Sequence, residues 1–161
     1  MKHRILLLFV LFLISSCDLI ISGSYPYSEN YTFDISRDKL IARIKELKNK
    51  NPDYKVITTF EKGEKGELPD GMNPQDTSSV FYTCYFYIRD SHMTLHCVIN
   101  ISNQVSSCPA RIQLTSMTKS INFGNWKDIN TKYLSKSENS QIKKIFESQI
   151  LDKLGTWRRD W

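Results

Sequence analysis

Residues 80–101 alternate between apolar and polar side chains in two runs that meet at the polar segment 89–92. This pattern is typical of an antiparallel hairpin that turns between Asp90 and Ser91. One face of the hairpin then pairs Val80 with Ile101, Tyr82 with Ile99, Cys84 with Cys97, Phe86 with Leu95 and Ile88 with Met93. A shift by one residue would move every one of these side chains to the other face. The sequence therefore predicts both the hairpin and its register.

The opposite face of the predicted hairpin mixes aromatic and polar side chains. Phe81, Tyr85, Tyr87 and His96 all lie on it. Because aromatic residues are enriched at protein interfaces, we interpret these four as a candidate partner-contact surface. A second core beneath a loop or helix would explain the same pattern.

The register also sets Cys84 opposite Cys97. Paired residues of an antiparallel ladder have Cα atoms about 4.5–5.5 Å apart, which is within disulfide range. Such a bond would stabilise the domain by roughly 3 kcal/mol in the chain-entropy model. The alternatives are a redox pair, a metal site or two buried thiols, and a bond between Cys97 and Cys108 is the rival connectivity.

Signatures of catalysis and of metal binding are missing from the sequence. His92 and His96 would lie about 13 Å apart on a strand, too far to bind one metal ion. The glycines Gly63, Gly66 and Gly71 match neither a P-loop nor a dinucleotide fingerprint. We therefore expect no catalytic residue, no metal and no cofactor.

Helices are predicted on both sides of the hairpin. Ser36 is a favourable N-cap for an apolar stripe at helical spacing that ends before Pro52. Ser135 and Glu138 have the spacing of a capping box, and the helix that they begin should end near Gly155, a favourable C-cap.

Two further strands are predicted at residues 54–60 and 111–118. Residues 61–79 are rich in glycine, proline and charged residues, and we interpret them as a long solvated loop. Strands flanked by helices favour an α+β fold. We predict a mostly antiparallel sheet of about four strands, with an N-terminal and a C-terminal helix packed on one face.

The N-terminus has the organisation of an export signal. Lys2 and Arg4 precede ten apolar residues, 5–14, a run too short to cross a bilayer as a helix. The following Ile14-Ser15-Ser16-Cys17 resembles the lipobox of bacterial lipoproteins: an aliphatic residue, here isoleucine in place of the usual leucine, then two small residues and a cysteine. The resemblance implies cleavage before Cys17 and acylation of its thiol and new amine by fatty chains such as palmitate.

The resemblance divides the chain into a signal peptide (1–16), a lipidated N-terminus with a tether (17–32) and a single globular α+β domain (33–161). Two or more acyl chains make a stable membrane anchor. The protein would then lie in the bacterial cell envelope, on the periplasmic side or at the cell surface, with the membrane left open. The alternatives are an ordinary secretory signal and an uncleaved anchor. Asp18 opposes the second, since a carboxylate in hydrocarbon costs about 2.5 kcal/mol or more.

The charge of the chain is mildly basic. The 22 lysine and arginine residues exceed the 17 acidic residues by five, and loss of Lys2 and Arg4 with the leader reduces this excess to three. No recognition motif points to nucleic acid as a partner.

The function expected from these features is that of a non-enzymatic binding or protective protein, of the immunity or inhibitor kind. Its partners would be the lipid bilayer, through acylated Cys17, and an envelope protein. The alternatives are an envelope hydrolase with a composite site, in which His96 works with Asp90 or Asp76, and a structural accessory of the envelope.

Overall fold

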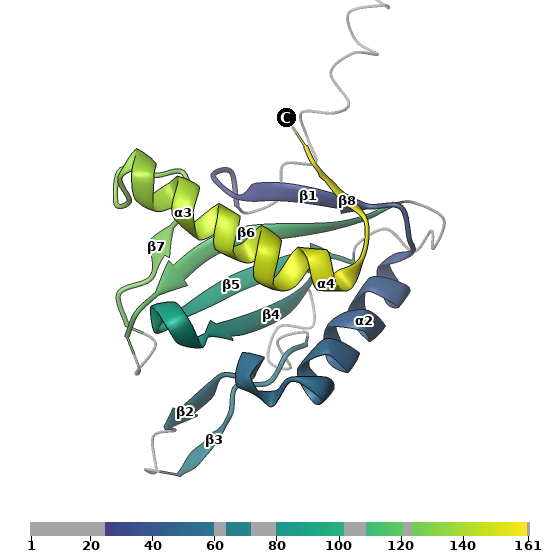
Figure 1. Ribbon diagram of the computed structural model, residues 1–161, viewed down its shortest axis with the longest axis horizontal. Helices are drawn as coiled ribbons and strands as arrows, with labels where there is room; N and C mark the ends of the chain where they lie inside the picture. The colour runs from purple at the N-terminus through teal and green to yellow at the C-terminus, as the bar shows by residue number, and fades with distance from the viewer. Residues whose placement is uncertain (1–24, 60–63, 72–79, 102–108, 121–123, 161) are drawn as a thin grey trace, which may run out of the picture.

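The computed structural model describes residues 25–59, 64–71, 80–101, 109–120 and 124–160 (Figure 1). Its centre is an antiparallel six-stranded sheet in the order β4-β5-β6-β1-β8, with β7 paired to β6. The strands are β1 (Glu29–Phe33), β4 (Phe81–Ile88), β5 (Met93–Asn100), β6 (Ala110–Thr118), β7 (Lys127–Asp128) and β8 (Trp157–Arg159). The predicted α+β class and the antiparallel sheet are confirmed.

Two main helices, α2 (Arg37–Lys50) and α3 (Lys136–Phe146), lie on the same side of the sheet (Figure 1). A π-helical turn, η4 (Glu147–Leu151), and the short α4 (Asp152–Leu154) continue α3. One apolar core joins the helices to the sheet, from Tyr31 on β1 to Leu154 on α4. Among the described residues, no helix combines the length and the apolar character that a bilayer span requires.

The predicted number of about four strands is wrong, because β1, β7 and β8 are short and lack a clear alternation. Strand β1 pairs with both β6 and β8, so residues 29–32, which the sequence analysis assigned to the tether, belong to the sheet. For the same reason α2 is not the first element of the domain. Cys17 and the rest of residues 1–24 lie outside the described residues.

The central hairpin has the predicted register, from Phe81 opposite Asn100 to Ile88 opposite Met93. Its apolar face is buried against the helices, with Cys84, Phe86 and Leu95 fully inaccessible. The turn is a short 3₁₀ segment, η3 (Arg89–Ser91), closed by His92 in the left-handed region at φ 47°.

The predicted strand at residues 54–60 is confirmed in part. Its first residue ends a 3₁₀ turn, η2 (Pro52–Tyr54), and β2 (Ile57–Thr59) pairs with β3 (Lys65–Glu67) in a separate two-stranded sheet. Strand β3 lies in the segment predicted to be a loop, and Gly71 in the same segment bridges to Thr83 of β4. Residues 61–63 and 72–79 of that segment lie outside the described residues.

The predicted helix ends are confirmed. The Ser36 hydroxyl accepts from the N–H of Lys39, and Ser135 and Glu138 form the full capping box. Gly155 follows α4 with φ 130°, a conformation that L side chains rarely adopt, and a Cβ there would also require the Arg43 guanidinium to shift. The sequence signals at these ends act locally, so they survive in the folded chain.

Candidate functional site

Three of the four predicted contact residues meet in one cluster of rings on the sheet face away from the helices. The rings of Tyr85 and His96 stack with centroids 5.0 Å apart. Tyr25 packs edge-on against Phe81 at 5.7 Å and against His96 at 6.0 Å. Trp126 lies 5.7 Å from His96 and 6.2 Å from Tyr85. We call Tyr25, Phe81, Tyr85, His96 and Trp126 the aromatic cluster; each member is half-buried.

A buried ion pair fixes the backbone of Tyr85 at the centre of this cluster. The Lys48 ammonium, on α2, lies 2.6 Å from the Asp70 carboxylate and donates to the carbonyl oxygen of Tyr85. The same carboxylate accepts from the N–H of Tyr85 at 3.1 Å. The N–H and the carbonyl oxygen of Tyr85 are thus both held at the outer edge of β4, the terminal strand of the sheet.

His96 is a neutral ring in this environment. Burial lowers the pKa of His96 to about 4. The Thr115 hydroxyl donates to the His96 carbonyl oxygen at 3.0 Å, and Nδ1 of the ring lies 2.9 Å from the same hydroxyl. A histidine that takes up a proton only near pH 4 is a poor general base at neutral pH, where a catalytic pKa near the working pH is favoured. These contacts favour a packing role for the ring.

Tyr87, the fourth predicted contact residue, lies outside the cluster. Its hydroxyl is 3.2 Å from Nδ1 of His92 in the hairpin turn. Both side chains open onto a groove of about 570 Å³ between the hairpin and the segment that includes Pro52 and Ile57. The predicted surface is therefore divided between the aromatic cluster and this neighbouring groove.

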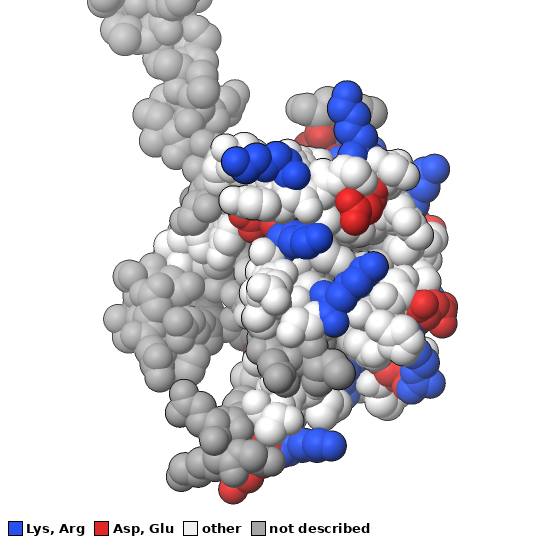
Figure 2. Space-filling view, turned by 90° about the vertical axis from the view of Figure 1, so that its left-hand side faces the viewer, with Lys and Arg blue, Asp and Glu red and all other residues white. Residues whose placement is uncertain are grey.

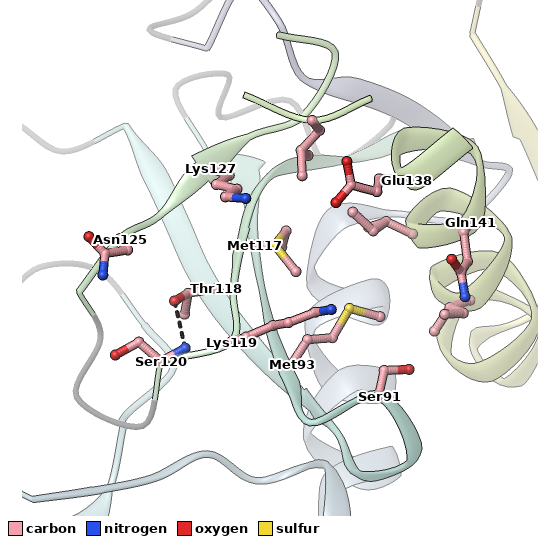
Figure 3. Close-up of a pocket in the computed structure, with 13 residues that line it drawn as sticks. Ser91, Met93, Met117, Thr118, Lys119, Ser120, Asn125, Lys127, Glu138 and Gln141 are labelled. Atoms are coloured by element: carbon pink, nitrogen blue, oxygen red, sulfur yellow. Dashed lines mark hydrogen bonds between the residues drawn. The ribbon is translucent and has the colours of Figure 1, made fainter. Parts of the chain in front are cut away.

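A second, smaller hollow lies between the end of the sheet and the first turns of α3 (Figure 3). This α3 pocket encloses about 280 Å³. Met93 and Met117 from the sheet and Ile142 and Ile145 from the helix supply its apolar wall, and Lys119, Lys127, Glu138 and Gln141 supply most of its polar rim. Figure 2 views the molecule from the side that carries β7 and the start of α3, where basic side chains stand out with acidic ones between them.

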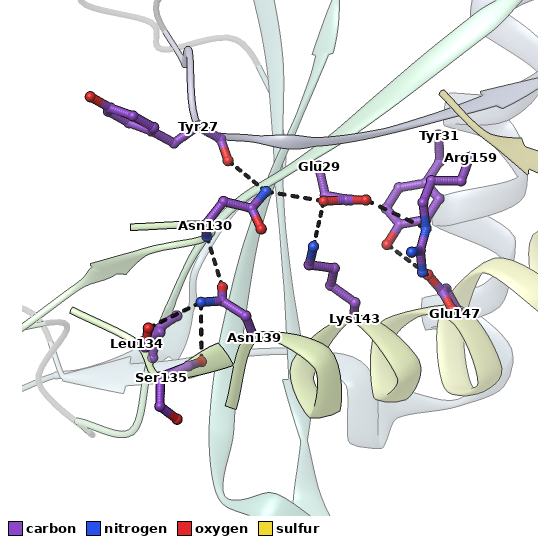
Figure 4. Close-up of polar contacts among 10 residues, drawn as sticks. All are labelled: Tyr27, Glu29, Tyr31, Asn130, Leu134, Ser135, Asn139, Lys143, Glu147 and Arg159. Atoms are coloured by element: carbon purple, nitrogen blue, oxygen red, sulfur yellow. Dashed lines mark hydrogen bonds and ion pairs between the residues drawn. The ribbon is translucent and has the colours of Figure 1, made fainter. Parts of the chain in front are cut away.

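A polar network connects the α3 helix to strand β1 (Figure 4). Glu29 accepts from Lys143 at 2.7 Å and from the Asn130 side-chain amide at 3.0 Å. The Tyr31 hydroxyl donates to Glu147 at 2.9 Å, and Arg159 of β8 pairs with the same carboxylate. Every charge has a partner within the network, which is the behaviour of a structural cluster.

The network also changes the pKa values of Glu29 and Tyr31. Burial would by itself raise the pKa of Glu29, but hydrogen bonds from Lys143 and Asn130 and the nearby charges lower it on balance. Burial, and then the Glu147 carboxylate, raise the pKa of Tyr31. The carboxylate is therefore held charged and the phenol neutral, so neither group is poised to exchange a proton near neutral pH.

Cys84 and Cys97 face each other across β4 and β5, as the register predicted, and both are fully buried. In the structure they are free thiols. Burial, together with a hydrogen bond and the charge of Cys84, raises the pKa of the Cys97 thiol. A thiol of raised pKa is a weak nucleophile, so the pair lacks the character of a reactive site. Their oxidation to a disulfide stays a prediction, and Cys108 lies outside the described residues.

The composite hydrolase site gains no support from the contacts of its histidine. The ring nitrogen of His96 meets the hydroxyls of Thr115 and Ser116, and Asp76 lies outside the described residues. Within the described ranges, no group of three or more histidine, cysteine or acidic residues gathers as a metal site would require.

Sequence reasoning missed Tyr25, Trp126 and the α3 pocket. Tyr25 lies in the segment predicted to be a tether, and Trp126 in a stretch without periodicity. A tryptophan at position 126, in a chain whose predicted strands are rich in aromatic residues, was the available signal for this contact. The residues next to Trp126 in the sequence do not indicate which sheet, or which face of it, the ring contacts.

Searches of protein-family models, of curated proteins and of solved structures find no match to this chain.

Proposed function

We propose that this protein is a lipid-anchored module of the bacterial cell envelope that binds a partner protein without catalysis, in the manner of an immunity protein or inhibitor. The observation that carries the proposal is the aromatic cluster. It gathers five rings, including three of the residues chosen from the sequence, and those three alternate along β4 and β5 with the residues that pack against α2 and α3. Aromatic side chains supply large contact areas at low conformational cost, which is why they dominate the centres of interfaces.

The cluster is held in place before any partner arrives. Lys48 and Asp70 fix both peptide groups of Tyr85, and Thr115 bonds to the ring nitrogen and the carbonyl oxygen of His96. Side chains that are already ordered lose less entropy on binding, so more of the contact energy appears as affinity.

The length of chain between the anchor and the domain limits where the partner can lie. Tyr25 lies eight positions after Cys17, with seven residues between them, and an extended chain spans at most about 3.6 Å per residue. The acylated cysteine would therefore keep the aromatic cluster within roughly 30 Å of the bilayer. We infer that the partner is a protein at the surface of the same membrane.

The anchor is tested in growing cells. Cys17→Ser should abolish labelling by a palmitate analogue, leave the signal peptide uncleaved by the lipoprotein peptidase and change the mass of the mature chain. A wild-type chain that fractionates with membranes and carries no acyl group would contradict the anchor and leave the contact surface to be tested separately.

The contact surface is tested by placing a photo-crosslinking amino acid at position 126 or, as a control, at position 133. Tyr133 is a tyrosine with 61% of its surface exposed that lies outside the cluster. We expect position 126 to form one adduct with a membrane protein, and Tyr85→Ala to reduce that adduct at least tenfold while the domain stays folded.

Equal adducts at positions 126 and 133, or an adduct unchanged by Tyr85→Ala, would contradict the proposal. Deletion that causes a general envelope defect, with no adduct at either position, would favour the structural accessory instead.

A further inference from the structure

The α3 pocket combines an apolar interior with a basic rim. Met93, Met117 and Ile142 are each less than 10% exposed, yet their side chains border the cavity. Two of these residues are methionines, whose flexible thioether chains adapt to ligands of irregular shape. A site of this composition favours the aliphatic part of a ligand.

Two lysines at the paired strands β6 and β7 border the same space on the sheet side of the pocket (Figure 3). Lys119 follows β6 and extends beside Met93, and Lys127 on β7 points toward Glu138. Neither ammonium forms an ion pair with a residue that the structure describes. The rim therefore offers two positive charges that no described acidic side chain neutralises in an ion pair.

Glu138, the one acidic side chain among the described residues that line the pocket, is already engaged. The Glu138 carboxylate accepts from the N–H of Ser135 at 2.8 Å in the capping box. That hydrogen bond lowers the pKa of Glu138, and the charges of Lys127 and Lys119 lower it further. Glu138 therefore offsets one positive charge, and the pocket retains an excess of positive charge at its mouth.

The volume limits the size of the ligand. A cavity of about 280 Å³ lies just below the usual range for small-molecule sites. Since each water in the liquid occupies about 30 Å³, the cavity holds the equivalent of roughly nine waters, or an aliphatic chain of eight to ten carbons.

We propose that the α3 pocket binds an aliphatic chain of about eight to ten carbons that ends in an anionic group. The chain lies against Met93, Met117 and Ile145, and the anion accepts charge-assisted hydrogen bonds from Lys119 and Lys127. This site is independent of the aromatic cluster, and it stands whether or not Cys17 is acylated. The chain comes either from a free fatty acid or from an anionic membrane lipid.

The test uses the full chain in phosphatidylcholine nanodiscs with ¹³C-labelled methionine methyl groups. Sodium decanoate should shift the methyl signals of Met93 and Met117 in a saturable manner, and decanol, which has the chain without the anion, should bind at least tenfold more weakly. Lys119→Gln with Lys127→Gln should weaken decanoate at least tenfold. Lys144→Gln, which removes an exposed lysine outside the pocket, should leave the affinity unchanged.

A second comparison separates the two sources of the chain. Signals already shifted in phosphatidylglycerol nanodiscs, and insensitive to added decanoate, assign the site to a membrane lipid; signals that shift only with decanoate assign it to a free acid. Ile145→Trp should fill the pocket and abolish the shift in either case, with the melting temperature reporting that the variant is folded.

The proposal is overturned if neither methyl signal responds in either nanodisc, or if decanol and decanoate bind equally. A response that persists in a folded Ile145→Trp variant also overturns it, because the chain would then lie elsewhere.

Discussion

The Lys48 ammonium and the Asp70 carboxylate form an ion pair at 2.6 Å in which the two side chains are only 6% and 12% exposed. Lys48 also lies over the Phe86 ring, 4.7 Å from its centroid. The pair links α2 to the segment before β4 and holds the backbone of Tyr85 between its two charges. It therefore connects the core on one face of the sheet to the aromatic cluster on the other.

Removal of one partner should be far more damaging than removal of both. Lys48→Met leaves Asp70 charged and unpaired in the interior, and we expect the free energy of unfolding to fall by about 3–5 kcal/mol. Lys48→Met combined with Asp70→Leu should recover part of this loss, because it removes the unpaired buried charge. The recovery is incomplete because the N–H and the carbonyl oxygen of Tyr85 then lose their partners. Urea denaturation followed by tryptophan fluorescence measures the free energy of unfolding of both variants. A double variant that is as unstable as the single variant would show that this account of the pair is wrong.

The two buried tyrosines Tyr31 and Tyr82 should respond differently to loss of the hydroxyl. Tyr31 donates to the Glu147 carboxylate, whereas the Tyr82 hydroxyl is buried with no partner among the described residues. We expect Tyr31→Phe to destabilise the protein by about 1.5–3 kcal/mol, as for hydrogen bonds to charged groups. Tyr82→Phe should be neutral or slightly stabilising. Equal losses in the same denaturation experiment would contradict the assignment.

His96 should make the protein less stable in mild acid. Burial lowers its pKa from 6.5 to about 4, so between these values the unfolded chain binds a proton that the folded chain does not. Stability is then complete above pH 6.5 and falls as the pH decreases toward 4, by up to about 3 kcal/mol. His96→Gln should remove this part of the pH dependence, while His92→Gln, at an exposed position, should retain it. A wild-type profile that is flat from pH 6.5 to 5 would refute the prediction.

Export, as proposed above, should lead to a disulfide between Cys84 and Cys97. The two residues are paired across adjacent strands, and the oxidising compartment that the proposed export implies favours the bond. Alkylation of the denatured protein should modify both thiols only after reduction, and mass spectrometry should find their peptides joined. Reduction should lower stability by roughly 3 kcal/mol. Full alkylation without reductant would show that they remain thiols.

The parts of the fold that depend on near neighbours could be predicted from the amino-acid sequence. The alternation in residues 80–101 specified the hairpin to the residue, because a slip by one would exchange its buried and exposed faces. Ser36, Ser135 and Gly155 specified where helices begin and end, because caps act on backbone groups within one turn. Phe81, Tyr85 and His96 were assigned to one face by the same alternation.

The contacts that join these parts became visible in the folded structure. Strands β1 and β8 are too short to show a period and exist because each completes the ladder of a distant segment. Lys48 and Asp70 are 22 residues apart, and Trp126 reaches the aromatic cluster from a stretch without periodicity. A short stretch of sequence shows the conformational preference of the backbone over a few residues. Contacts between residues far apart along the chain depend on how the whole core packs, and a short stretch of sequence does not contain that information.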